Sequence, residues 1–148
     1  MSDAPSEEMT LAEARAWLRA RVDDGEACPC CTQFAKVYRR KVHGTMARAL
    51  ITMWRQAGTD YVNIADLRKR GGGDETKMAY WSLIEPNAEH EALWRITPLG
   101  EQFVHNQCSI AKYCHVYNAR PLRWSGPPVS IVDALGTRFN YHDLMQGI

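Results

Sequence analysis

The sequence has no apolar run that approaches the roughly 20 residues needed to cross a bilayer. Its first ten residues, MSDAPSEEMT, are acidic and lack the basic, apolar and small-residue regions of a secretory signal. The five cysteines are odd in number, and three of them crowd together, which does not suit a secreted disulfide framework. We therefore expect a cytoplasmic location and no membrane partner.

Common catalytic signatures are absent as well. The chain contains no P-loop, no G-x-G-x-x-G, no G-x-S-x-G, no H-E-x-x-H and no paired-carboxylate pattern. Cys114 lies beside His115, and His142 beside Asp143, but adjacency in sequence does not give a nucleophile and a base the geometry they need. We predict that the protein is not an enzyme.

The length and composition are those of one globular domain with an appendage. The chain has 148 residues, of which 45% are hydrophobic and 24% charged. We predict three parts: an N-terminal helix and cysteine-rich turn over residues 1–31, a core over residues 32–106, and an extension over residues 107–148.

The formal net charge of +1 hides an uneven distribution along the chain. Residues 1–27 carry −4, residues 36–77 carry +6 and residues 78–148 carry −1. A basic middle is the usual electrostatic footprint of a nucleic-acid surface. Solvated helix faces would give the same count, so charge alone leaves both interpretations open. The ten basic residues of this segment are Lys36, Arg39, Arg40, Lys41, Arg48, Arg55, Arg68, Lys69, Arg70 and Lys77.

Near the N-terminus, Thr10 and Glu13 have the spacing of a capping box, in which each side chain accepts a hydrogen bond from the other residue's backbone N–H. Apolar residues follow at spacings of three and four from Leu11 to Val22. These signals predict an amphipathic helix over residues 10–21.

Cysteines follow this helix. Cys28 and Cys31 have the spacing of half a tetrahedral zinc site, and Cys108, three residues after His105, is a candidate for the distant half. A zinc ribbon would have a second C-x-x-C, so a free cluster of small cysteines that includes Cys30 is the favoured alternative. A redox C-x-x-C is less favoured, because no βαβ pattern surrounds it. Zinc is the single candidate cofactor.

The apolar spacing from residue 32 to residue 57 predicts two helices with a break at His43-Gly44. Asn63 should cap a short helix over residues 64–70, and Gly71-Gly72-Gly73 should form the next turn. A second short helix is then expected over residues 74–81, with Met78 facing inward. The residues of this helix expected to face outward are Thr76, Lys77 and Tyr80.

A hairpin should come next. The corner Leu83-Ile84 leaves the helix, residues 87–91 form a polar tip, and residues 93–96 alternate in polarity as a returning strand. Thr97 is a good N-cap and Pro98 a good first residue for a helix over residues 98–106, because proline has no N–H to leave unpaired.

The run WRITPLGEQF, residues 94–103, resembles the strand-to-helix passage of winged helix-turn-helix transcription factors. Leu83-Ile84 is similar to the corner after their recognition helix, with Ser82 in place of a glycine. The arrangement also resembles small proteins encoded by phages and prophages. The resemblance covers about residues 45–106 and implies a mainly α (α+β) fold, with a winged helix-turn-helix core, an N-terminal helical segment and a small C-terminal β-rich extension.

By this resemblance, residues 74–81 are the recognition helix of a protein that binds double-stranded DNA and regulates phage or prophage transcription, with a homodimer as a candidate assembly. Side chains of this helix would approach base edges or phosphates, and the basic run before it would meet the backbone. The implied DNA-binding residues are Arg68, Lys69, Arg70, Thr76, Lys77, Tyr80 and Arg95.

The C-terminal third is rich in aromatic residues. Residues 112–117 and 129–132 predict a hairpin around a turn-rich loop, and Asn140 predicts the cap of a last helix. This region is either an extension of the core or a surface for a partner or a second copy. Together with Glu89 and Glu91 at the hairpin tip, it supports an alternative function: an adaptor or inhibitor that binds a host protein complex.

Overall fold

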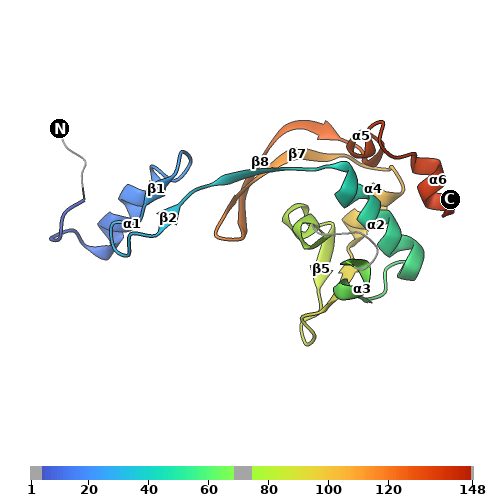
Figure 1. Ribbon diagram of the computed structural model, residues 1–148, viewed down its shortest axis with the longest axis horizontal. Coiled ribbons are helices and arrows are strands. Elements are labelled where there is room, and N and C mark those ends of the chain that lie inside the picture. The colour runs from blue at the N-terminus through green and yellow to red at the C-terminus, as the bar shows by residue number, and fades with distance from the viewer. Residues whose placement is uncertain (1–4, 69–74, 148) are drawn as a thin grey trace. The chain divides into compact units, whose positions relative to one another are not determined.

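The computed structural model describes residues 5–68 and 75–147, without the side chain of Arg68. The chain divides into two compact units, and Figure 1 labels most of their helices and strands. Unit 1 comprises Met1–Arg40 and His115–Arg123, and unit 2 comprises Lys41–Cys114 and Trp124–Ile148. The division of the chain at residues 31 and 106 stays a prediction.

Helices make up 38% of the structure and strands 26%, and the strands form three small antiparallel sheets. The fold is therefore an α+β mixture, and the prediction of a mainly α fold is wrong. Two segments produce most of the difference: residues 34–41, expected to be helical, and residues 120–128, expected to be a loop, are both largely extended.

Unit 1 begins with α1 (Leu11–Arg19), and the predicted capping box is confirmed. The Glu13 N–H donates to Thr10 Oγ1 at 3.1 Å, and the Thr10 N–H donates to Glu13 Oε1 at 3.3 Å. Ala14 is buried and Leu11 is exposed, so α1 has one packed face. The chain then enters β1 (Glu26–Ala27), which pairs with β2 (Phe34–Ala35).

The next strand, β3 (Tyr38–Lys41), replaces the helix that was expected before His43. The spacing of Phe34, Val37, Tyr38 and Val42 fits one face of a helix, but it is too short to exclude an extended chain. Val37 and Val42 are buried, whereas Phe34 is 62% exposed and Tyr38 is 50% exposed. The four side chains therefore do not share one buried face, as a packed helix would require.

The centre of unit 2 is α2 (Gly44–Ala57), which begins where the break at His43-Gly44 was expected. Leu50 and Ile51 are fully buried on its inner side. At 14 residues α2 is the longest described helix, and no described helix is long and apolar enough to span a membrane. Each of the other described helical elements of unit 2 contacts α2 (Figure 1): α3 (Ile64–Arg68), η1 (Glu75–Trp81), α4 (Pro98–Val104), α5 (Ile131–Leu135) and α6 (Tyr141–Gln146).

A three-stranded antiparallel sheet lies beside these helices. Its strands are β4 (Val62–Asn63), β5 (Ile84–Pro86) and β6 (Leu93–Ile96), and their order in the sheet is β4-β6-β5. Asn63 also caps α3 as predicted, because its Oδ1 accepts the Ala65 N–H at 2.9 Å. The predicted hairpin and returning strand are confirmed.

The third sheet has the order β3-β7-β8, with β7 (Ile110–Tyr117) and β8 (Arg120–Val129) as its other strands. A C-terminal hairpin was predicted, but its return strand is β8 and begins directly after a tight turn, so the expected long loop is wrong. Residues 129–132 are not that strand either, because Ser130 and Asp133 form a capping box that starts α5. The predicted Asn140 cap of α6 is confirmed.

Candidate nucleic-acid interface

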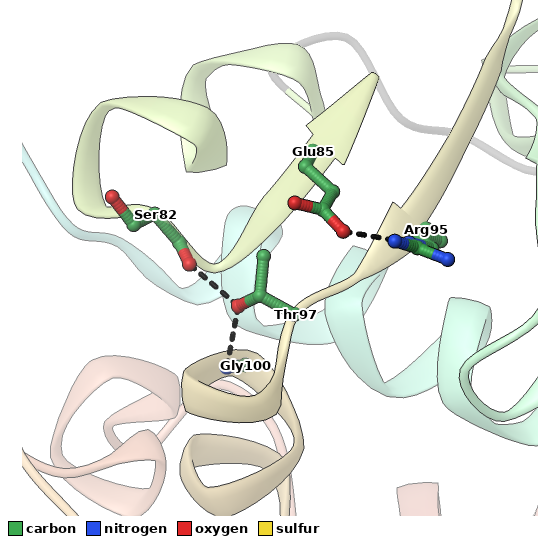
Figure 2. A network of polar contacts seen from close by, with 5 residues as sticks. All are labelled: Ser82, Glu85, Arg95, Thr97 and Gly100. Carbon is green, nitrogen blue, oxygen red and sulfur yellow. Dashed lines mark hydrogen bonds and ion pairs between the residues drawn. The ribbon is translucent and has the colours of Figure 1, made fainter. Parts of the chain in front are cut away.

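Thr97 joins the end of η1 to the start of α4 (Figure 2). Its hydroxyl donates to the Ser82 carbonyl oxygen at 2.6 Å and accepts the Gly100 N–H at 3.0 Å. Its backbone N–H donates to the Leu83 carbonyl oxygen at 3.1 Å. Ser82 has a φ of 60°, the left-handed conformation that favours glycine, and this is the position where the winged-helix pattern has glycine.

The predicted recognition helix is η1, a 3₁₀ helix of seven residues. The inward position of Met78 is confirmed, since it is 1% exposed. Glu75 is buried too, so its carboxylate is not displayed on the surface. The three residues expected to face outward are each half-buried, so only part of each side chain reaches solvent: Thr76, Lys77 and Tyr80. Asp74 lies outside the described residues.

Two strands, β7 and β8, hold the last turn of η1, and this contact was not predicted from the sequence. The Trp81 indole N–H donates to the Ala111 carbonyl oxygen on β7 at 2.8 Å. The Trp124 indole N–H on β8 donates to the Tyr80 carbonyl oxygen at 3.0 Å, and the Cys114 thiol lies 3.9 Å from the same oxygen. These partners are 30, 44 and 34 residues apart, beyond the reach of any local pattern.

Among the predicted phosphate contacts, Arg68 ends α3, and Lys69 and Arg70 lie outside the described residues. Arg95 is engaged on the surface of the hairpin, where its Nε donates to Glu85 Oε1 at 2.6 Å (Figure 2). Its guanidinium also lies 4.8 Å from the centre of the Tyr61 ring. The hydrogen bond to Glu85 raises the pKa of Arg95, which stays a cation.

A basic groove along α2 was missed from the sequence. It has a volume of about 400 Å³, and Leu144 of α6 contributes to its other wall. Arg48 and Arg55 were counted in the basic middle, and their spacing of seven residues, with Thr52 between them, was the available signal. Polar and basic side chains of α2 line the groove: Arg48, Thr52, Arg55 and Gln56.

The three cysteines of unit 1 lie in one turn, where the Cys28 N–H donates to the Gln33 carbonyl oxygen at 2.8 Å. Hydrogen bonds from the backbone N–H groups of Cys31 and Cys30, and from the Cys31 thiol, lower the pKa of Cys28. Cys108, the proposed distant zinc ligand, is in unit 2, and burial raises its pKa. Within residues 5–68 and 75–147 no three His, Cys, Asp or Glu side chains gather as a metal site, and zinc binding stays a prediction.

The described part of unit 2 thus brings η1, the hairpin and the start of α4 together through Thr97, and it places two further arginines on α2. Such an arrangement can position cations and polar side chains against a polyanion. No family model, curated protein or solved structure matches the chain.

Proposed function

We propose that unit 2 binds duplex DNA as the winged-helix resemblance implies, and that it regulates phage or prophage genes. The observation that carries the proposal is the order α2, β4, α3, η1, β5, β6, with the sheet order β4-β6-β5. Two consecutive short helical elements followed by a hairpin agree with that arrangement. In a helix-turn-helix the second helix enters the major groove, and η1 takes this place in the chain.

The cations of η1 and of the segment that precedes it in the sequence support the same proposal. Lys77 belongs to η1 itself, and Arg68, Lys69 and Arg70 precede it in the sequence. Each phosphate that a protein neutralises releases counterions and steepens the dependence of log affinity on log salt by about 0.9. With so few cations, we expect weak binding whose affinity depends only shallowly on salt.

Arg95 needs a change of partner before it can contact a phosphate. Its ion pair with Glu85 is exposed, at 44% and 43% for the two side chains. Exposed ion pairs are screened by solvent and contribute little to stability, so replacement of the carboxylate by a phosphate costs little. A phosphate also offers the planar guanidinium two oxygens, which strengthens the bond.

A second candidate function is supported by the charges of the hairpin. Glu89 and Glu91 at its tip are exposed, and Glu85 already faces Arg95. This surface repels a phosphate backbone and suits a basic partner protein. The alternative is therefore an adaptor or inhibitor that docks its acidic hairpin on a protein of a host complex.

The proposed cytoplasmic location rests on the cysteines. All five are free thiols. Free thiols are kept reduced in the cytosol, whereas oxidising compartments favour disulfides.

The test is a mobility shift with labelled duplex DNA over a salt series starting at about 50 mM. Wild-type protein should bind, and Lys77→Ala and Arg68→Ala should each weaken binding and reduce the salt slope by about 0.9. Arg138→Ala is the matched control, because it removes one exposed cation of unit 2 that is not among the predicted DNA contacts.

Two results would contradict duplex binding: no shift at the lowest salt, or identical shifts for wild type, Lys77→Ala and Arg68→Ala. Retention of a basic partner from nuclease-treated lysate, lost in Glu89→Lys with Glu91→Lys, would then favour the docking alternative.

A further inference from the structure

The most exposed aromatic side chains of the described part of unit 1 lie on β2 and β3. Phe34 is 62% exposed and Tyr38 is 50% exposed. We define the aromatic strip as Phe34, Lys36, Tyr38 and Arg40. Apolar side chains that are exposed together on one surface often mark a site of interaction.

Cations flank the Tyr38 ring of this strip. The Lys36 Nζ lies 5.8 Å from the centre of the Tyr38 ring, and the Arg40 guanidinium carbon lies 5.6 Å from it. Residues 33–40 contain three basic side chains and no acidic one. The strip therefore combines ring faces with positive charge, and its ligand should offer flat π systems and negative charge together.

Phe34 is held in position although it is exposed. An ideal Cβ on Gly25 would lie 2.4 Å from Cζ of the Phe34 ring, so the ring rests against the backbone of a residue that has no side chain. Gly25 has a φ of +95°, which glycine adopts easily. The ring is thus pre-positioned, which reduces the entropy lost when a ligand stacks on it.

A groove runs beside the strip. Its volume is about 320 Å³, at the lower end of the roughly 300–1,000 Å³ typical of small-ligand sites. Three aromatic rings, two amide side chains and one ammonium line it: Phe34, Tyr38, Tyr117, Gln33, Asn118 and Lys36. Rings can stack on a base, amides can donate to and accept from its edge, and the ammonium can pair with a phosphate.

We infer that the aromatic strip and its groove bind single-stranded nucleic acid. Unpaired bases expose their faces to aromatic side chains, and cations follow the backbone. A duplex hides its base faces in the helical stack, so the rings of the strip would gain little from it. An acidic peptide would satisfy the cations but would leave the ring faces without a stacking partner.

The inference is tested by fluorescence anisotropy of the full chain with a labelled oligothymidine of about 20 nucleotides in about 50 mM salt. Wild type should bind saturably. Phe34→Ala and Tyr38→Ala should each weaken binding by between about 5-fold and 150-fold, the usual range for loss of one stacked base. Tyr38→Phe keeps the ring and should retain affinity. Leu11→Ala, a change at another exposed apolar residue of unit 1 (59%), is the matched control and should have no effect.

Competitors separate stacking from charge. Inorganic polyphosphate has phosphates without bases, and polyglutamate imitates an acidic protein. Both should displace the oligothymidine far less well than unlabelled oligothymidine does. Equal displacement by either would overturn the inference, in favour of simple charge attraction or of a protein partner.

Ultraviolet cross-linking to the wild-type chain gives a readout that does not depend on the folding of variants. Mass spectrometry should find the linked nucleotide on a peptide that contains Phe34 or Tyr38. Cross-links confined to other segments, or no binding of oligothymidine at all, would overturn the inference. Since duplex binding is proposed for unit 2, either proposal can fail without the other.

Discussion

A side chain at position 100 would collide with the backbone at the junction of η1, β5 and α4. An ideal Cβ on Gly100 would lie 2.1 Å from the Leu83 carbonyl oxygen and 2.9 Å from Cγ2 of Ile96. Gly100→Ala forces the chain after η1 to shift, and it should lower the free energy of unfolding by about 1–3 kcal/mol. Urea denaturation measures the loss.

Leu99→Ala is the control for this variant, because Leu99 lies on the same helix and is 37% exposed. Its substitution should change stability by only about 0.5 kcal/mol. Equal losses in the two variants would show that the close approach at Gly100 has no special cost.

Cys28 and Cys108 should differ in reactivity. Hydrogen bonds from the backbone of Cys31 and Cys30 lower the pKa of Cys28, whereas burial raises the pKa of Cys108. The thiolate is the reactive form, so iodoacetamide should modify Cys28 at lower pH than Cys108. Residue-resolved mass spectrometry over about pH 6 to 10 measures both profiles.

The unfolded chain provides the reference for these two profiles. In concentrated urea the local hydrogen bonds and the burial are lost, and the two pH profiles should converge. If they already coincide in the folded protein, the turn does not stabilise the Cys28 thiolate.

At the scale of elements, the Thr97 hydroxyl caps the N-terminus of α4 and also bonds to Ser82, directly after η1. Thr97→Ala removes the bond to Ser82 and the cap on Gly100, and it should lower the free energy of unfolding by about 1–2 kcal/mol. Thr97→Ser keeps the hydroxyl and should retain most of that stability in the same denaturation experiment. A serine variant as unstable as the alanine variant would point to the lost methyl group instead.

The attachment of η1 to β7 should be measurable separately. Trp81 is 4% exposed, and Trp81→Phe removes its bond to the Ala111 carbonyl as well as part of its packing. We expect a loss of about 1–3 kcal/mol in the free energy of unfolding. Trp94→Phe makes the same chemical change at a half-buried position on β6 and should cost less. Equal costs would mean that this attachment does not stabilise the fold.

The features predicted correctly are mostly those fixed by contacts between residues close together in the sequence. Thr10, Thr97 and Asn140 cap helices through bonds that span three residues, and all three caps were predicted from sequence. The Ser130 capping box has the same kind of signal, but it was overlooked in favour of the apolar run around it. The prediction of a helix over residues 34–41 was wrong, because a short apolar spacing fits a helix and a strand alike.

The candidate site was less predictable than the fold. Its composition follows from the sequence, since Lys77, Arg95 and the arginines of α2 are all visible as cations. Their surroundings depend on partners that were not identified from the sequence. Glu85 lies opposite Arg95 in the register of the hairpin, whereas tertiary packing brings Leu144 to the groove on α2.

At the scale of the whole molecule, charge placement sets the strength of the proposed DNA binding. Replacement of the two exposed acids at the hairpin tip, in Glu89→Lys with Glu91→Lys, removes repulsion and adds two cations. Affinity for duplex DNA at low salt should rise, and the salt slope should steepen by up to about 1.8 if both lysines reach phosphates. The same mobility shift measures this, with Glu13→Lys on α1 as the control. Unchanged or weaker duplex binding would indicate that the hairpin does not face DNA.

The two indoles that hold the last turn of η1 have a consequence for experiment. Trp81 is almost completely buried, and its N–H group donates to the Ala111 carbonyl oxygen on β7. Trp124 on β8 is half exposed, and its N–H group donates to the Tyr80 carbonyl oxygen in η1. Indole emission changes in wavelength and intensity with polarity and hydrogen bonding. A ligand that displaces η1 must disturb both surroundings, so the intrinsic fluorescence of the unlabelled chain will report the event as it occurs.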